Sequence, residues 1–286
     1  MKTNFFNFLR LFFQIPFAEK WLVKHVKSKS SNSFYGKLVP NNYQYPKGSI
    51  REFEFNGVNL KLDIHDYVSH YLYFQFKDYG MEQLMNLVEK DYFVLDIGTN
   101  YGSTILQFAR KVGKNGTCFG FEPDPINFKI CTENLNLNSD LKISVENIGL
   151  GDKKGTFNLV VDTESNRGGN RISTNTSGKE SHTVNVEVLD QWISNKSIER
   201  LDLIKIDVEG FELNVLKGGI ETLKKFKPVL FIELDDENLK LQNHSAKELI
   251  EFLENLGYSV LNAVSNKQIL STDDFTFCHF DVVAKI

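Results

Sequence analysis

From residue 92 onward, short apolar runs alternate with longer stretches in which apolar residues recur at helical spacing. This alternation is typical of a mostly parallel sheet whose connecting helices cover both faces. The last two runs are joined by a loop too short for a crossover helix, so we expect them to pair antiparallel at one end of the sheet. The seven predicted strands cover residues 92–96, 117–122, 142–146, 201–206, 228–234, 257–263 and 276–284.

Three further segments have patterns of their own. Residues 51–64 alternate apolar and polar positions around Asn56 and Gly57, which predicts a two-residue β-hairpin. Residues 66–89 have helical spacing with a break expected at Gly80. Residues 156–161 and 183–188 predict an inserted β-hairpin around the polar stretch 162–182. That stretch is either a mobile surface loop or an acceptor-binding lid whose polar side chains include Arg167, Asn170 and Arg171.

The first 29 residues combine aromatic residues at helical spacing with a following group of lysines. The apolar run is too short and too interrupted to span a bilayer, and it lacks a small-residue cleavage site. One interpretation is a helix that lies in the membrane interface, as a peripheral contact. The alternative is a helix docked on the domain itself or on a second copy of the chain. We expect a helical extension over residues 1–48 and a catalytic domain over 49–286.

Composition narrows the class of protein. The 286 residues carry a formal charge of −4, with mixed signs along the chain, so nucleic acid is not expected as the main partner. The cysteines form no C-x-x-C pair and the six histidines no metal-binding spacing. Cys118, Cys131 and Cys278 are therefore expected to be buried apolar residues of a reducing, cytoplasmic compartment.

The segment from Asp96 to Gly102 holds the most informative chemistry. A strand ends at Asp96, turns on Gly98 and Gly102 around Asn100, and enters a helix, which is where α/β proteins bind ligands. The glycine spacing differs from the G-x-G-x-x-G that holds a pyrophosphate, which disfavours a nicotinamide-dependent oxidoreductase. The carboxylate of Asp96 would repel phosphate but suits a ligand with an ammonium or sulfonium group, such as S-adenosylmethionine.

A second acidic residue ends the next predicted strand. Glu122 precedes Pro123 and Asp124, and an acid at this place in a βαβ unit accepts hydrogen bonds from a ribose. The alternative is that Glu122 or Asp124 only caps the following helix. Both interpretations stay open at this point.

Acidic residues also follow two later strands. Asp207 and Glu209 come after the strand at 201–206, and Glu233 lies near the end of the strand at 228–234. Adjacent strands that end in carboxylates provide a general base or ligands for a hard divalent cation. The alternative is a set of solvated carboxylates at helix N-termini.

These motifs together resemble the FkbM family of S-adenosylmethionine-dependent methyltransferases over about residues 91–233. The resemblance implies a class I methyltransferase (Rossmann-like) fold that transfers a methyl group to oxygen, commonly a hydroxyl of a sugar or natural product. The family usually has alanine where this chain has Thr99, a small change. The segments that carry the resemblance are residues 96–102, 121–125, 134–138, 149–152, 205–212, 215–218 and 228–233.

The leading hypothesis is an O-methyltransferase acting on a carbohydrate of a glycan or glycolipid. Asp207 is the expected base or metal ligand, followed by Glu209 and Glu233, with Asp207 and Glu233 as ligands for a divalent cation such as Mg²⁺. A non-catalytic scaffold that docks on a glycosyltransferase or membrane is an alternative. The acceptor, the position methylated, metal dependence and oligomeric state stay open. The expected cofactor-binding residues are Asp96, Gly98, Asn100, Gly102, Glu122, Pro123, Asn147 and Gly149, the last two near the adenine.

Overall fold

The computed structural model describes residues 5–163, 165–173 and 180–286, with no side chains described for residues 5–8. The chain forms two compact units. The first comprises Met1–Tyr79 and Thr163–Gly168, and the second comprises Gly80–Asp162 and Gly169–Ile286. The boundary predicted between residues 48 and 49 falls within the first unit.

Residues 5–78 of the first unit form three helices, two short 3₁₀ turns and the predicted hairpin. Asn56 and Gly57 have φ values of 50° and 81°, which a tight two-residue hairpin turn requires. The core lies where Leu22 and Val26 pack near Phe74. The elements are α1 (Phe5–Phe12), α2 (Pro16–Val26), η1 (Gly36–Leu38), η2 (Asn42–Gln44), β1 (Ile50–Phe55), β2 (Val58–Asp63) and α3 (Tyr67–Phe74).

The break expected at Gly80 was wrong. The helical stretch ends earlier, because Gln75 takes a left-handed conformation with φ 52° and its N–H bonds to the carbonyl of Leu72. Gly80 lies inside the next helix, α4 (Tyr79–Leu87), where it is buried. A glycine in the first turn of a helix is tolerated, so the spacing alone misplaced the break.

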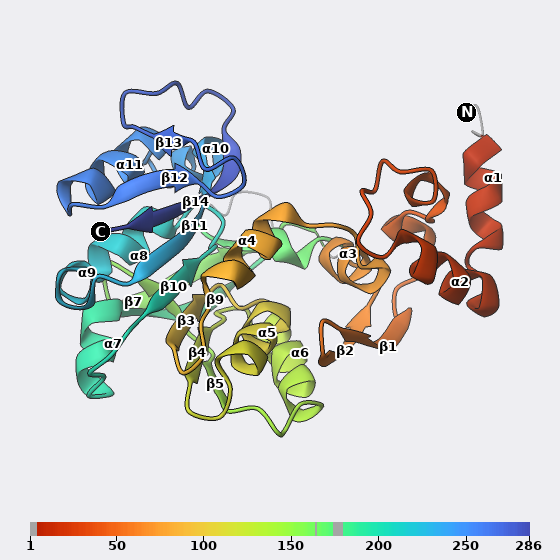
Figure 1. The fold of residues 1–286 in the computed structure, drawn as a ribbon, viewed down its shortest axis with the longest axis horizontal. Coiled ribbons are helices and arrows are strands. Elements are labelled where there is room, and N and C mark those ends of the chain that lie inside the picture. The colour runs from red at the N-terminus through yellow and green to blue at the C-terminus, as the bar shows by residue number, and fades with distance from the viewer. Residues whose placement is uncertain (1–4, 164, 174–179) are drawn as a thin grey trace. The chain divides into compact units, whose positions relative to one another are not determined.

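The second unit is built on an eight-stranded mixed sheet with the order β13-β12-β14-β11-β10-β3-β4-β5 (Figure 1). All seven predicted strands are present. The final strand pairs antiparallel with both of its neighbours, while the five strands on one side of it, which end at the sheet edge, pair parallel with one another. The eighth, β13, has two residues, too few to produce a periodic signal. The strands are β3 (Phe93–Ile97), β4 (Thr117–Phe121), β5 (Ile143–Glu146), β10 (Leu203–Ile206), β11 (Val229–Asp235), β12 (Ser259–Asn262), β13 (Gln268–Ile269) and β14 (His279–Lys285).

Apolar side chains cover both faces of this sheet, as the unbroken apolar runs predicted. Val94 packs with Phe108 of α5 on one face. Leu95 and Ile204 belong to the larger cluster on the other face, with side chains of α7, α8, α9 and α11. The helices of this unit after α4 are α5 (Ser103–Val112), α6 (Pro125–Asn136), α7 (Leu189–Asn195), α8 (Glu212–Gly218), α9 (Ile220–Phe226), α10 (Asp236–Lys240) and α11 (Ala246–Asn255).

The predicted inserted hairpin is part of a larger element. Its two strands, β7 (Gly155–Val160) and β9 (Ser181–Val188), pair antiparallel as expected. They belong, however, to a four-stranded sheet of order β6-β9-β7-β8, with β6 (Gly149–Gly151) and β8 (Arg171–Ile172) as its edges. Strands of two or three residues escape pattern analysis. The polar stretch also contains η3 (Arg167–Gly169), while its residues 164 and 174–179 lie outside the described residues.

The expected burial of the cysteines is confirmed for two of the three residues. Cys118 and Cys131 are buried, whereas Cys278 is half-buried in the turn that precedes β14. The expected strand at 276–284 begins only at His279, because residues 273–277 form a turn in which Asp274 accepts hydrogen bonds from Thr276.

Candidate active site

Three of the predicted acidic residues lie at the carboxyl ends of three adjacent strands. Asp96 lies in β3, Glu122 directly follows β4, and Asp207 directly follows β10. Because these strands are parallel neighbours, their carboxyl ends form one edge of the sheet. The order of strands and acidic residues along the sequence alone predicted that these side chains meet at one edge.

A buried lysine, which sequence reasoning did not assign a role, connects two of these acids. Lys205 Nζ lies 3.5 Å from Asp96 Oδ1 and 3.1 Å from Asp207 Oδ2. Burial by itself lowers the pKa of Lys205, but the carboxylates of Asp207 and Asp96 outweigh it and hold that pKa above its ordinary value. Burial raises the pKa of Asp96 to about 6, against the lowering effect of Lys205. In the sequence, the one sign of this role of Lys205 is that it is a lysine inside an otherwise apolar strand.

The two glycines of the turn allow close packing. Gly98 has a φ of 88°, and a Cβ added there would lie 1.8 Å from the carbonyl oxygen of Asp207. Gly102 has a φ of 86°, and its added Cβ would lie 2.8 Å from Cys131 Sγ. Glycine is therefore required at both positions for conformation and for space. The turn thereby brings the loop after β3 against the loop after β10.

Glu122 ties the glycine turn to the next loop. Its side chain is 5% exposed and accepts hydrogen bonds from the backbone N–H groups of Asn100 (2.7 Å) and Asp124 (2.9 Å). Burial raises the pKa of Glu122 to about 8, and these two hydrogen bonds oppose the rise. Asp124 caps α6 by accepting from the N–H of Ile126, so the capping alternative holds for Asp124.

The remaining predicted cofactor-binding residues gather beside Glu122. Asn147 Nδ2 donates to the carbonyl oxygens of Glu122 (2.8 Å) and Pro123 (3.0 Å). A Cβ added to Gly149, at the start of β6, would lie 3.7 Å from Pro123 Cβ. The structure thus brings the residues chosen from the sequence to one edge of the sheet.

Asp207, Glu209 and Glu233 form an acidic cluster, each offering an oxygen within 4.8 Å of the others. Burial, then Asp207 and other carboxylates, raise the pKa of Glu209 to about 8 and that of Glu233 well above its ordinary value. Glu233 Oε2 is buried without a hydrogen-bond partner within the described chain. So many carboxyl groups with few donors favour a bound proton or cation.

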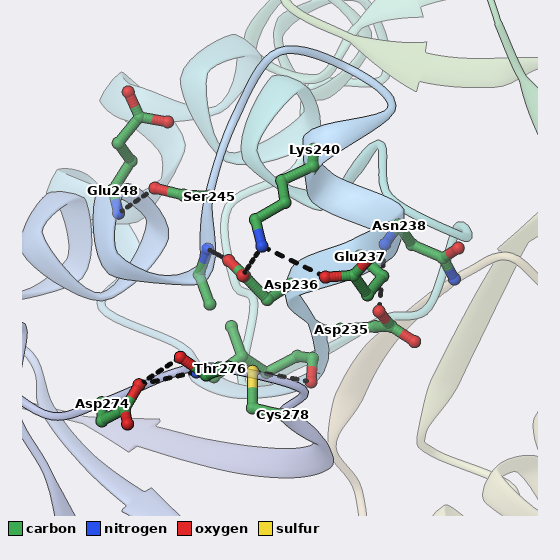
Figure 2. Close-up of polar contacts among 12 residues, drawn as sticks. Asp235, Asp236, Glu237, Asn238, Lys240, Ser245, Glu248, Asp274, Thr276 and Cys278 are labelled. Atoms are coloured by element: carbon green, nitrogen blue, oxygen red, sulfur yellow. Dashed lines mark hydrogen bonds and ion pairs between the residues drawn. The ribbon is translucent and has the colours of Figure 1, made fainter.

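Two residues that the sequence did not single out hold the loop that carries this cluster. Asn238 Nδ2 donates to Glu209 Oε2 at 2.9 Å, and the carboxylate of Glu212 accepts from the N–H groups of Val208 and Gly210, both at 3.0 Å. Asn238 is itself placed by Asp235, which caps α10 and accepts from the Asn238 N–H at 3.0 Å (Figure 2).

The turn after β11 is further fixed by charged groups. Lys240 Nζ lies 2.7 Å from Asp236 Oδ2 and 3.1 Å from Glu237 Oε1 (Figure 2). Asp236 also accepts from the N–H of Ala246. These contacts make α10 a firm support for Asn238. The acidic cluster is therefore positioned by the loop after β10 and the turn after β11, and each of these is held by hydrogen bonds to side chains.

Comparison with known proteins identifies the family. The FkbM methyltransferase domain matches residues 96–260, which is more than half of the chain. The chain is 31% identical over 175 residues to the 2-O-methyltransferase NoeI of Sinorhizobium fredii, covering 55% of this chain and 69% of that protein. The chain belongs to the FkbM methyltransferase family. This confirms the resemblance stated from the motifs.

The chain is also similar to two further proteins. The hexuronic acid methyltransferase AglP of Haloferax volcanii is 27% identical over 147 residues, covering 51% of this chain and 58% of that protein. The FkbM methyltransferase structure from Methylobacillus flagellatus shares 19% identity with a TM-score of 0.43, covering 68% of this chain and 43% of that one. The matches thus span 43 to 69% of the length of these proteins.

The FkbM domain match begins at Asp96 and ends beyond Glu233, so it contains every predicted site residue. The strand order of the main sheet, with its last strand inserted antiparallel beside β11, is that of the predicted class I methyltransferase fold. The enzyme class is therefore methyltransferase. Residues 1–79, which form most of the first unit, lie outside the match.

Proposed function

We propose that this FkbM methyltransferase transfers a methyl group from S-adenosylmethionine to a hydroxyl of a carbohydrate. Two relatives are named for a 2-O-methyltransferase activity and for a hexuronic acid as substrate, which supports a sugar acceptor. The main structural support for the proposal is the position of the Asp207 side chain. Its carboxylate is 40% exposed and lies at the strand end next to the glycine turn.

The donor site would use the glycine turn and the loop after β4. Gly98, Asn100 and Gly102 would hold the methionine end, with Asp96 acting near the ammonium through backbone or water because its side chain is fully buried. Asn100 Oδ1 is buried without a hydrogen-bond partner in the described residues, which suits a donor group of a ligand. Glu122 would hold the ribose, and Pro123, Asn147 and Gly149 would line the adenine.

When bound, S-adenosylmethionine supplies a methyl group already activated on a sulfonium, so the protein must orient the acceptor and remove one proton. Asp207 Oδ1 or Oδ2 would take the proton from the attacking hydroxyl, a contribution of typically 10²–10⁴-fold. Lys205 would hold the Asp207 carboxylate in place. Glu209 and Glu233 are the next candidates for this task, since both lie in the same cluster.

A divalent cation is the alternative use of the same carboxylates. Asp207 and Glu233, with Glu209 beside them, offer the oxygen ligands that Mg²⁺ prefers. The unpartnered Glu233 Oε2 and the 4.8 Å spread of the three oxygens fit such an ion. A cation there would lower the pKa of the acceptor hydroxyl as a Lewis acid.

The test is incubation of a panel of glycans and glycolipid sugars with labelled S-adenosylmethionine, followed by mass spectrometry, with and without a chelator. We expect a methyl mass gain on a carbohydrate hydroxyl. Asp207→Asn should lower turnover by about 10²–10⁴-fold while calorimetry shows unchanged affinity for S-adenosylhomocysteine. Glu251→Gln, on the exposed side of α11, is the matched control.

The outcomes separate the parts of the proposal. Activity that survives chelation favours Asp207 as base, and activity that chelation abolishes and Mg²⁺ restores favours the metal. Full turnover in Asp207→Asn removes Asp207 from the mechanism. Transfer to other acceptor classes without any transfer to carbohydrates overturns the sugar assignment.

A further inference from the structure

Residues 1–48, which lie in the first unit, carry a charge opposite to that of the whole chain. Residues 1–48 hold seven lysines and one arginine against one acidic residue, a formal charge of +7, while the whole chain has −4. That one acid, Glu19, is buried and accepts hydrogen bonds from Arg51 Nε at 2.7 Å and Tyr73 Oη at 2.8 Å. The exposed charge of this segment is therefore entirely positive.

An aromatic cluster lies among these basic residues. Ring contacts run without interruption from Phe12 to Phe13, from Phe13 to Trp21, from Trp21 to Tyr35 and from Tyr35 to Phe34. These five residues, here called the N-terminal aromatic cluster, join α1, α2 and the segment before η1. Phe12 is 53% exposed and Phe34 is 72% exposed. Exposed apolar side chains that lie together in this way are typical of an interaction site.

Helix α2 has basic and aromatic side chains on the same exposed face. Ala18, Glu19, Leu22 and Val26 form its buried face. The opposite face, at spacings of three and four residues, carries Phe17, Lys20, Trp21 and Lys24, all exposed. Lys20 and Lys24 make no ion pair within the described residues, so their charge is available to a partner.

We propose that this face of the first unit binds the surface of an anionic lipid membrane. Exposed aromatic rings insert at the level of the headgroups, and lysines beside them bind anionic lipids. None of the helices in the described part of the chain combines the length and hydrophobicity that a bilayer-spanning segment needs. The proposal is independent of the acceptor and of the reaction at the acidic cluster.

The experiment is co-sedimentation of the full chain with vesicles of phosphatidylcholine, with and without phosphatidylglycerol. We expect binding that requires phosphatidylglycerol and weakens with salt. Each lysine near such a surface is worth roughly fivefold in affinity, so Lys20→Glu with Lys24→Glu should weaken binding by at least about 25-fold. Phe17→Ser with Phe34→Ser should weaken it by about tenfold or more.

Matched variants in the second unit control for general surface effects. Lys247→Glu with Lys267→Glu changes two exposed lysines, and Ile126→Ser with Phe277→Ser changes two exposed apolar residues. Both should bind vesicles as the wild type does. All variants should retain the wild-type circular dichroism spectrum and melting temperature within a few degrees.

Tryptophan fluorescence gives a second, local measurement. The chain has two tryptophans, of which Trp21 is 42% exposed and Trp192 is 4% exposed. Brominated lipid should quench the emission of Trp21, and Trp21→Phe should abolish that quenching. Absence of vesicle binding, or binding without dependence on phosphatidylglycerol, overturns the proposal. A dimer in solution that Phe17→Ser with Phe34→Ser dissociates, without vesicle binding, instead assigns the face to a second copy of the chain.

Discussion

Lys205 and Asp96 are register partners on adjacent parallel strands, and the lysine ammonium lies 3.5 Å from the Asp96 carboxylate. The carboxylate is fully buried, and Lys205 is 6% exposed. Removal of one partner of a buried ion pair is costly because the other charge stays behind without compensation. The two residues therefore stabilise the strand ends only when both are present.

Lys205→Met should lower the free energy of unfolding by about 3–5 kcal/mol, as measured by urea denaturation. The reason is the uncompensated Asp96 carboxylate, which will then bind a proton more readily. The double variant Lys205→Met with Asp96→Asn should recover most of this loss. If the double variant is no more stable than Lys205→Met, the charge of Asp96 is not the cause.

Gly98→Ala tests the close approach of the glycine turn to the loop after β10. Both Gly98 and Gly113 have positive φ, but an added Cβ meets the Asp207 carbonyl at 1.8 Å in the first case and nothing within 4 Å in the second. Gly113 has φ 74° and ψ −165°, a conformation that is essentially restricted to glycine, so Gly113→Ala should cost only conformational strain of about 1–3 kcal/mol. Gly98→Ala should cost about 1–3 kcal/mol more, since backbone must move. Equal losses in urea denaturation would contradict the packing argument.

The sequence predicted the strands of the main sheet and the edge at which the acids meet. Runs such as Phe93–Ile97 are buried on both faces, so their apolar pattern is strong, and a parallel sheet sends all their carboxyl ends to one edge. Asp96, Glu122 and Asp207 could be placed there because each follows or ends such a run. This part of the site depends only on local pattern and topology.

The details that depend on contacts across the fold could not be predicted. The role of Lys205 follows from the register of β10 with β3, and that of Asn238 follows from the packing of α10 against the loop at Glu209. Neither relationship has a signature along the chain. The two-residue strands β8 and β13 were missed for a related reason, because their partners and not their own residues define them.

The pKa of Glu209 predicts how stability changes with pH. Its ordinary value is 4.5, and burial followed by the charge of Asp207 raises it to about 8 in the folded protein. Between these values the folded state binds more protons than the unfolded state, so stability falls as pH rises. The loss is up to about 1.4 kcal/mol for each pH unit in this window.

Thermal denaturation between pH 5 and pH 8 measures this effect. Glu209→Gln removes the titrating group, so its melting temperature should fall less with rising pH than that of the wild type. Glu251→Gln, which changes an exposed glutamate, should follow the wild type. The contrary result is a melting temperature that rises steadily from pH 5 to pH 8 in the wild type and follows the same curve in Glu209→Gln. That result would show that Glu209 titrates near its ordinary value.

Glu122→Gln tests whether the carboxylate that joins the glycine turn to the loop after β4 also supports donor binding. Its two oxygens accept from the N–H groups of Asn100 and Asp124, and glutamine can replace only one of them. The buried N–H left without an acceptor should cost about 1–3 kcal/mol of unfolding free energy. With either hydrogen bond lost, the glycine turn at Asn100 is no longer tied to the loop at Asp124, so affinity for S-adenosylhomocysteine in a calorimetric titration should fall as well.

Asp124→Asn is the matched comparison for this variant. Asp124 accepts from the N–H groups of Ile126 and Asn127, so its substitution disturbs the same loop while Glu122 stays in place as the acceptor for the Asn100 N–H. If Glu122 contributes to the donor site, Glu122→Gln should lose more affinity for S-adenosylhomocysteine than Asp124→Asn does, although the two variants lose similar stability. If both variants lose affinity equally, Glu122 only supports the loop, and the ribose must be held by other groups at this edge of the sheet.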